Sequence, residues 1–435
     1  MVVKMNRFQS DELADLGWQL SPAFEWSNSR QYDIAFLLAP NIPVPNIGGN
    51  AIASLVTALA EGMQFNSIIF SMRPENSIEN NSTHMQFHLA HYQKDLSPSI
   101  LDRGKILPRI KSLLITPTYY SWRKYARDAA KACVLLGVKC LVVEDVADFG
   151  WVVHKVRKHG VHVVLHQHAF TQRNYRTYLW RCIERNLDKI IFVSNKTRNM
   201  TEMRHGKLKV PVSVIYNGVN LDHYDPLKWK GNTDSLREVL RLKNFERVLT
   251  FIGRLHHSKG VIQALNAYLA MGNINIAFII VGSKEGTNND DYFQEVLSNV
   301  NEAVAQGYPI YIFENIGQDL IPAYYGLSDY ILLPSMGHEG LPKVVTEALA
   351  MGIPVIASDR GGIWELLEEG RNGWLIADPV SPQTILAALS TALSTTDSEL
   401  AMIKKSISDF DRPKMDQQRM ISSFQQELIE TMGEI

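Results

Sequence analysis

The sequence predicts an α/β protein made of two Rossmann-like, doubly wound domains. From about Tyr32 onward, short apolar runs alternate with helical patterns, the order that a parallel sheet with covering helices requires. A second alternating series starts near Val248, after a polar stretch. The chain of 435 residues is long enough for two domains, each with a core of its own.

The first domain is predicted to span residues 32–216, after an irregular extension over residues 1–31 that is assigned no chemistry. A helix is expected over residues 50–61, whereas residues 73–111 have a poor pattern that indicates loops and short helices. The strands expected in this domain are 33–38, 67–71, 112–116, 140–144, 162–166, 189–193 and 212–216.

The polar and charged residues 217–245 are interpreted as a linker to a second domain over residues 246–405. A C-terminal segment, residues 406–435, contains an amphipathic helical pattern over 414–432. The strands expected in the second domain are 248–252, 277–281, 310–313, 330–333 and 355–358, with helices such as 261–271 and 292–306 between them.

The composition is that of an ordinary globular protein, with 46% hydrophobic and 20% charged residues. A net charge of -1 argues against bulk attraction to nucleic acid, so no nucleic-acid partner is expected. Three cysteines without ligand-like spacing indicate a reducing compartment rather than disulfides or a zinc site. The N-terminus does not resemble a signal peptide, and no apolar run approaches the ~20 residues of a membrane helix. We therefore expect a cytoplasmic protein.

The stretch from Ser335 to Glu365 is the most informative part of the chain. It places Glu339 and Glu347 eight residues apart, between two short apolar runs that are typical of buried parallel strands. Pro342 suits the first turn of a helix, because its missing N–H would have no partner there, and Gly352 ends that helix. Both carboxylates are thus expected near the carboxyl edge of a sheet, where open α/β sheets bind ligands.

This block, with its Gly-Leu-Pro, Gly-x-Pro and Gly-Gly elements and Glu365, resembles the C-terminal domain of the retaining glycosyltransferases of family 4. Their wider group includes glycogen-synthase-like enzymes and enzymes of capsule and polysaccharide synthesis. The resemblance implies the GT-B fold, in which two Rossmann-like domains face each other across a cleft. It also implies that Glu339 contacts the donor sugar and Glu347 the ribose of a nucleotide sugar, with Gly340 and Leu341 beside them in the donor site.

Arg254 and Lys259 form a cationic corner, since Gly-Arg-Leu ends one expected strand and Ser-Lys-Gly precedes the next helix. A guanidinium fork and an ammonium point charge together suit a diphosphate, which the matching residues bind in the family. The same cations would stabilise the charge that develops on a departing nucleoside diphosphate, so neither a metal nor another cofactor is expected. The Asp409-Phe-Asp411 motif lies in the C-terminal tail and is interpreted as a helix-terminus feature.

The first domain offers three further features. Gly48 and Gly49 follow the first expected strand, and the family has a glycine-rich loop there, near the donor phosphate and acceptor. His166 ends another expected strand; it fits the family's donor-facing histidine better than His168, and its role would be to hold a sugar hydroxyl. The residues that follow a third strand are candidates to meet the acceptor, namely Glu144, Asp145 and Asp148. Less clear roles transfer to Ser194, Asn217 and Glu365.

A basic pattern suggests one more partner. Arg181, Arg185 and Lys189 recur at a helical spacing of four residues, with aromatic residues nearby. An amphipathic basic helix can rest on an anionic membrane, so peripheral membrane contact is one interpretation and a solvated helix face is the other.

The sequence therefore predicts a metal-independent, retaining hexosyltransferase that moves a sugar from a nucleoside-diphosphate sugar, such as a UDP-sugar, to a glycan or lipid-linked acceptor. Two alternatives stay open. One is a non-catalytic GT-B scaffold or binding subunit, and the other is a sugar-nucleotide epimerase or phosphorylase-like relative. In GT-B enzymes the last helix returns to the first domain, so the same is expected of residues 406–435.

Overall fold

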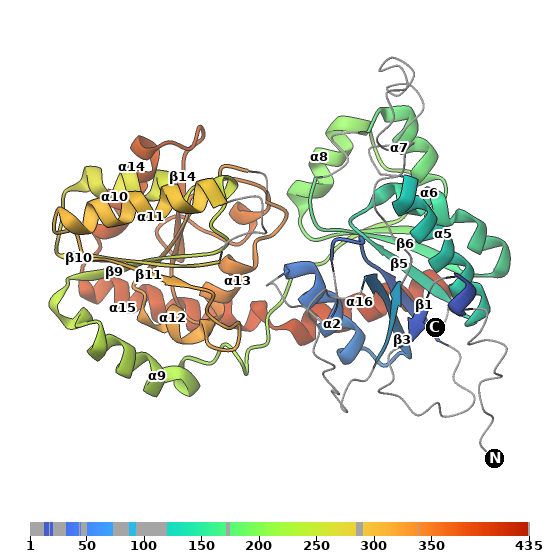
Figure 1. The fold of residues 1–435 in the computed structure, drawn as a ribbon, viewed down its shortest axis with the longest axis horizontal. Helices are drawn as coiled ribbons and strands as arrows, with labels where there is room; N and C mark the ends of the chain where they lie inside the picture. The colour runs from blue at the N-terminus through green and yellow to red at the C-terminus, as the bar shows by residue number, and fades with distance from the viewer. Residues whose placement is uncertain are drawn as a thin grey trace. The chain divides into compact units, whose positions relative to one another are not determined.

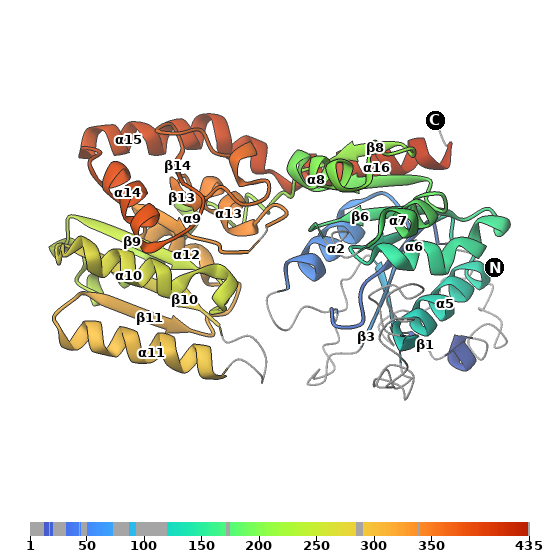
Figure 2. The ribbon, with the colours of Figure 1, turned by 90° about the horizontal axis from the view of Figure 1, so that it is seen from above.

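The computed structural model describes residues 13–16, 18–20, 32–42, 44, 50–72, 87–92, 120–170, 175–283, 290–337 and 339–433. The chain divides into two units, one comprising Met1–Tyr216 with Met420–Ile435 and the other Asn217–Arg419. Each unit has one mainly parallel sheet with helices on both faces, as Figures 1 and 2 show. The predicted fold class of two doubly wound α/β domains is confirmed.

The first unit contains an eight-stranded sheet in the order β1-β4-β3-β2-β5-β6-β7-β8. All neighbouring pairs are parallel except β1 with β4. Strands β2, β5 and β7 are buried along their whole length, which is why they were visible in the sequence as continuous apolar runs. The strands are β1 (Trp18–Leu20), β2 (Ile34–Leu37), β3 (Ser67–Met72), β4 (Phe87–Tyr92), β5 (Cys140–Glu144), β6 (His162–Gln167), β7 (Lys189–Phe192) and β8 (Val212–Val214).

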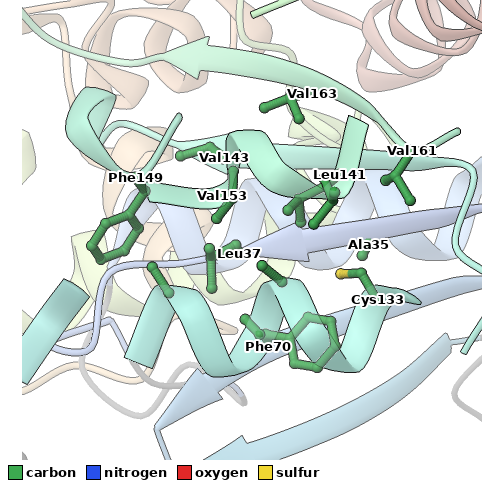
Figure 3. Packing of buried hydrophobic residues seen from close by; sticks show 14 of the residues in the cluster. Ala35, Leu37, Phe70, Cys133, Leu141, Val143, Phe149, Val153, Val161 and Val163 are labelled. Carbon is green, nitrogen blue, oxygen red and sulfur yellow. The ribbon is translucent and has the colours of Figure 1, made fainter. Parts of the chain in front are cut away.

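Helices cover both faces of this sheet. On one face Phe149 of α6 packs with Leu37 and Val143 of the sheet (Figure 3). On the other face Phe424 of the last helix, α16, is fully buried with Phe36 of β2. The C-terminal helix therefore belongs to the first unit. The main helices of this unit are α2 (Ala51–Gly62), α5 (Tyr120–Leu135), α6 (Ala147–Val153), α7 (Thr177–Glu184), α8 (Asn195–His205) and α16 (Gln417–Met432).

The second unit contains a six-stranded sheet in the order β11-β10-β9-β12-β13-β14, and every neighbouring pair is parallel. Its strands are β9 (Arg247–Ile252), β10 (Ile276–Gly282), β11 (Ile310–Glu314), β12 (Tyr330–Leu333), β13 (Val355–Ser358) and β14 (Gly373–Ile376). The helices are α9 (Pro226–Val239), α10 (Val261–Met271), α11 (Asp290–Ala305), α12 (Ile321–Leu327), α13 (Lys343–Ala350), α14 (Pro382–Leu393) and α15 (Asp397–Ser406). Their ribbons are labelled in Figure 1. Buried residues of α10, α11 and α14 belong to one core, and buried residues of α12 and α13 belong to a second core.

Four features differ from the sequence prediction. The extension over residues 1–31 is not wholly irregular, because it contributes β1 and the buried Trp18. Strand β4 lies within residues 73–111, which had indicated loops and helices, and β14 was not predicted. The predicted linker over residues 217–245 is part of the second unit and contains α9. The strand expected over residues 112–116 lies outside the described residues.

Candidate active site

The candidate active site begins at the carboxyl edge of the six-stranded sheet. The chain leaves β9, forms β10 and β11 on one side, and returns to pair β12 with the other side of β9. This reversal of strand order is the position at which open α/β sheets bind ligands. Arg254 and Lys259 follow β9, and Glu339 follows β12, so the predicted cations and the first carboxylate lie on adjacent strand ends.

Lys259 and Glu339 are in direct contact. The Lys259 Nζ donates to Glu339 Oε1 at 2.5 Å, and the Ser335 hydroxyl donates to the same oxygen at 2.7 Å. The Lys259 and Glu339 side chains are only 18% and 14% exposed, so the pair is better shielded than an ordinary surface ion pair. The carboxylate of Glu339 is therefore oriented before any ligand arrives.

Two glycines allow the surrounding loops to approach this closely. Gly260 has φ +71°, and a Cβ there would lie 2.2 Å from the carbonyl oxygen of Pro334. Gly361 has φ +69°, and a Cβ there would lie 1.5 Å from the carbonyl oxygen of Glu339. Both positions require glycine for backbone conformation and for space. The Gly-Gly element after β13 thus fixes the loop that carries Glu339.

The second carboxylate, Glu347, lies on α13 and is 8% exposed. Its Oε2 accepts a hydrogen bond from the Tyr325 hydroxyl at 2.8 Å, and its Oε1 lies 3.6 Å from Lys343 Nζ. Gly340 and Leu341 lead into α13 and are buried, and the Leu341 carbonyl accepts from Asn217 Nδ2 at 3.3 Å. Pro342 occupies the N-cap position of α13. The sequence had suggested for this proline the first turn, which begins one residue later.

The arrangement combines two cations with two oriented carboxylates at one sheet edge. The exposed Arg254 and the adjacent Lys259 provide donors for a phosphorylated anion. Glu339 and Glu347 provide acceptors for hydroxyl groups, since an ionised carboxylate accepts hydrogen bonds on both oxygens. A polyhydroxylated, phosphorylated molecule such as a nucleotide sugar matches this set of groups.

Two family models match the chain, and together they cover most of it. The model described as Glycosyltransferase Family 4 matches residues 49–223, and the model described as Glycosyl transferases group 1 matches residues 232–409. The second match contains both cations and both carboxylates of the site. The chain belongs to the group 1 and family 4 glycosyltransferases.

Curated relatives of this glycosyltransferase are similar over part of their length. Spore coat protein SA of Bacillus subtilis is 28% identical over 223 residues, which is 50% of this chain and 58% of that protein. The lipopolysaccharide 1,2-N-acetylglucosaminetransferase of Salmonella typhimurium is 29% identical over 189 residues, which is 42% of this chain and 48% of the relative. The chain thus spans about half the length of the curated relatives that it matches.

Solved structures share the GT-B fold with this glycosyltransferase. Anabaena HepE in complex with UDP has a TM-score of 0.69 and 18% identity, covering 93% of this chain and 100% of that one. Sucrose-phosphate synthase from Thermosynechococcus elongatus has a TM-score of 0.72 and 18% identity, with the same coverage. At such identities the likeness establishes the fold.

In the first unit, this glycosyltransferase has a buried polar cluster at the carboxyl edge of β5 and β6. Glu144 Oε2 lies 2.6 Å from His168 Nε2 and 3.0 Å from His166 Nδ1. Burial opposes the charge on Glu144, but both imidazoles outweigh it and hold the pKa of Glu144 at about 2. Burial lowers the pKa of His166, whereas Glu144 raises that of His168 against the effect of burial. Of the two imidazoles, His168 is therefore the easier one to protonate.

The residue types of this cluster also bind metals, and their ligand atoms lie within 4.8 Å of one another. Ligands of one tetrahedral ion at ~2.1 Å would lie about 3.4 Å apart, however, and both imidazoles are closer than that to a single carboxylate oxygen. The arrangement is that of a hydrogen-bonded cluster. His166, predicted to face the donor sugar, is 2% exposed and packs against Phe424, whereas His168 lies beyond the end of β6.

The two aspartates predicted to meet the acceptor are engaged within the unit. Asp148 is fully buried and its carboxylate accepts from the Tyr175 hydroxyl at 2.8 Å, a contact that supports the core. An acceptor role for Asp148 stays a prediction. Asp145 has φ +58° and accepts from the backbone N–H groups of His168 and Ala169 at 3.0 and 3.1 Å. It thereby fixes the turn after β6, and an acceptor role for Asp145 stays a prediction.

Other predicted positions have structural roles or lie outside the described part of the chain. Ser194 is the N-cap of α8, and its hydroxyl accepts from the Thr197 N–H at 3.2 Å. Asp411 of the Asp-x-Asp motif is buried and forms a bidentate pair with Arg371 at 2.7 and 3.0 Å. Gly48 and Gly49 lie outside the described residues, so their role is still an expectation.

The basic helix that suggested membrane contact is not present as predicted. Helix α7 ends at Glu184, and Lys189 lies in β7, where it is buried and paired with Glu427. Arg181 pairs with Glu184 at 2.5 Å and donates to the His205 carbonyl at 2.6 Å. Among the described helices, none combines the length and hydropathy of a membrane-spanning segment. The basic helical pattern that had suggested membrane contact is therefore absent from these described residues, and it no longer supports such contact.

Sequence reasoning missed the residues that support the two carboxylates. Ser335 holds Glu339, and Tyr325 holds Glu347 from a different helix. Ser335 lies two residues after the end of β12, so its position beyond a strand end was a usable signal. Tyr325 is 22 residues before Glu347, and no local pattern links the two.

Proposed function

We propose that this protein is a retaining, metal-independent glycosyltransferase that moves a sugar from a nucleoside-diphosphate sugar to the hydroxyl of a glycan or lipid-linked acceptor. The observation that carries the proposal is the Lys259–Glu339 contact beside Arg254, at the reversal point of the second sheet. The cations bind the diphosphate, Glu339 binds the donor sugar and Glu347 binds the ribose. The first unit binds the acceptor.

The chemistry follows from where charge develops. The bond between the anomeric carbon and the β-phosphate oxygen breaks, and the acceptor oxygen bonds to the same face of that carbon. The hydroxyl proton passes to the departing phosphate oxygen, so the step is balanced and retains the anomeric configuration. Arg254 and Lys259 stabilise the growing negative charge of the leaving group, which is the part of the reaction that preorganised charges accelerate most. Because two side-chain cations supply this charge, the proposal includes no metal.

Uridine diphosphate is the first nucleotide to test. The structurally similar Anabaena HepE has been solved with UDP and with UDP-glucose, and several curated relatives are named as glycosyltransferases. Those names describe the relatives, and they support a donor of this class for the present chain. The same names support an acceptor of the glycan class.

The test is thermal unfolding with UDP, GDP and ADP in turn, all in EDTA, on wild type and Glu347→Ala. A ligand at a hundred times its dissociation constant adds about 2.7 kcal/mol to native stability, which gives a clear shift in Tm. We expect one nucleotide to stabilise the wild type in EDTA and to lose most of its effect in Glu347→Ala. If no nucleotide raises the Tm of the wild type and none binds by direct calorimetry, the proposal is wrong.

Turnover separates the two carboxylates. With UDP-glucose as donor and water as a slow acceptor, Glu347→Ala should mainly raise KM, whereas Glu339→Ala should mainly lower kcat. The anomeric configuration of the released sugar, followed by NMR before mutarotation, tests retention. Wild-type turnover in both variants would refute the site assignment.

A further inference from the structure

Glu347 is held by a tyrosine that sequence analysis did not assign to the site. The Tyr325 hydroxyl, on α12, donates to Glu347 Oε2 at 2.8 Å. The Tyr325 ring packs edge to face against the ring of Tyr224, which precedes α9, with centroids 6.1 Å apart and planes at 71°. The carboxylate therefore receives a phenolic donor from a separate helix, and a second tyrosine packs against the ring that carries this donor.

The protonation state of both phenols follows from this environment. Tyr325 is fully buried and Tyr224 is 9% exposed. Burial, and then the neighbouring charge of Glu347, raise the pKa of both tyrosines well above the ordinary value. Both phenols stay protonated at physiological pH, so Tyr325 acts as a donor towards the Glu347 carboxylate. A buried carboxylate needs such donors, since an unpaired one costs several kcal/mol.

The Tyr325 hydroxyl occupies only part of the carboxylate. An ionised carboxylate has about four acceptor positions, and this phenol takes one of them. Lys343 lies 3.6 Å from Oε1, beyond a normal hydrogen bond. The phenol of Tyr325 fixes Oε2, so the remaining acceptor positions have a defined direction rather than the freedom of a flexible glutamate side chain.

We infer that Tyr325 is a positioning residue that sets the Glu347 carboxylate for the vicinal hydroxyls of a ribose. It thereby determines a preference for ribonucleotides over deoxyribonucleotides. The inference rests on the proposed function, because it takes Glu347 as the ribose ligand.

The test compares UDP with 2′-deoxy-UDP by titration calorimetry on wild type and Tyr325→Phe. Removal of a hydroxyl partner from a charged hydrogen-bonding site costs roughly tenfold in affinity, so wild type should prefer UDP by about that factor. Tyr325→Phe should reduce the preference to less than about threefold, chiefly by weakening the binding of UDP. The affinity for 2′-deoxy-UDP should change less, because that ligand has only the 3′-hydroxyl left to meet Glu347.

Tyr268→Phe is the matched control. Tyr268 is a buried tyrosine of the same unit whose hydroxyl donates to the Ile276 carbonyl at 2.7 Å, away from Glu347. It should lose stability as Tyr325→Phe does and keep the wild-type ratio of affinities. A purely structural role for Tyr325 would likewise leave that ratio unchanged, and this outcome would overturn the inference.

The outcomes separate this inference from the proposed function. If wild type binds UDP with no preference over 2′-deoxy-UDP, the inference fails while nucleotide binding stands. If wild type prefers UDP and Glu347→Gln loses the preference, but Tyr325→Phe keeps it, Glu347 binds ribose and Tyr325 does not position it. If UDP, GDP and ADP all fail to bind, the proposed function fails and the inference fails with it.

Discussion

Lys259 and Glu339 are eighty residues apart in the sequence, yet the Lys259 Nζ donates to Glu339 Oε1 at 2.5 Å. The contact joins the turn after β9 to the loop after β12, and Ser335 supports it from the same loop. A cation that is paired in the unliganded protein has less net charge to offer a diphosphate. The pair therefore sets the affinity of the site as well as its geometry.

Replacement of Lys259 by methionine should lower the affinity for UDP by at least tenfold. The affinity for uridine, which has no phosphate, should stay almost unchanged. The substitution removes the cation and leaves the shielded carboxylate of Glu339 to repel the diphosphate, and tenfold corresponds to about 1.4 kcal/mol. Titration calorimetry with the two ligands measures the effect. The double variant Lys259→Met/Glu339→Gln should recover part of the loss.

Lys230→Met is the control for this prediction. Lys230 forms an exposed ion pair with Asp234 on α9, and such pairs contribute little. This variant should bind UDP like the wild type. Equal UDP affinity in Lys259→Met and wild type would remove Lys259 from the site.

Gly361→Ala should destabilise the second unit more than Gly370→Ala does, and it should also lower the affinity for UDP-glucose. Both glycines have a positive φ, +69° and +72°, so each substitution carries about 1–2 kcal/mol of backbone strain. A Cβ at Gly370 meets nothing within 4 Å, whereas one at Gly361 overlaps the Glu339 carbonyl. The overlap adds about 1–3 kcal/mol and displaces the loop that holds the sugar-binding carboxylate.

Urea unfolding and calorimetry with UDP-glucose test the two parts of this prediction. Gly370→Ala should keep the wild-type affinity for UDP-glucose. Similar stability and affinity in the two variants would mean that the Gly-Gly element does not fix the Glu339 loop.

The extent to which the sequence predicted this structure follows from the kind of pattern involved. Parallel strands such as β5 and β12 are buried on both faces, so their continuous apolar runs were visible without any structure. Strand β4 has two histidines among its six residues, and β1 has only three residues and pairs antiparallel with β4. Such elements depend on tertiary pairing, which leaves no local pattern.

The site was predicted as a set of motifs rather than as a geometry. The rule that ligands bind at the carboxyl edge of parallel strands was enough to place Lys259 and Glu339 at one edge. Contacts between distant side chains, such as Tyr325 with Glu347, have no periodic signal and were missed. The prediction that Lys189 lies on a basic helix was wrong for a different reason. The helical spacing in the sequence was extended beyond the end of α7 into strand β7.

The contribution of His168 to stability should decrease as the pH rises. Its pKa in the folded protein is above the ordinary 6.5, because Glu144 outweighs the effect of burial. The stabilisation from this shift is therefore fully present below about pH 6.5 and is lost as the pH rises through the raised pKa. The difference in unfolding free energy between wild type and His168→Gln should be largest at about pH 6. It should be smallest once the pH exceeds the raised pKa of His168.

Urea unfolding followed by circular dichroism between about pH 5.5 and 9 tests this dependence. In a Glu144→Gln background the partner charge is absent, so adding His168→Gln there should produce no such loss with pH. His166 faces the same carboxylate and has a lowered pKa, which acts in the opposite direction, so it is kept in every variant. A pH-independent difference between wild type and His168→Gln would contradict the raised pKa of His168.

Trp18→Ala should destabilise the first unit although the residue lies in a segment that the sequence had suggested was irregular. Trp18 is 2% exposed, and its ring centroid lies 4.8 Å from that of Phe70 and 5.1 Å from that of Tyr125. Truncation of a large buried aromatic residue costs about 3–5 kcal/mol through lost transfer free energy and the cavity that is left. Hydrogen exchange of peptides from β3 and α5 measures the loss where those rings lie. Trp364→Ala is the control, because Trp364 is 44% exposed in the second unit and should change stability by less than about 0.5 kcal/mol. Unchanged protection of β3 and α5 in Trp18→Ala would show that the N-terminal strand is not part of this core.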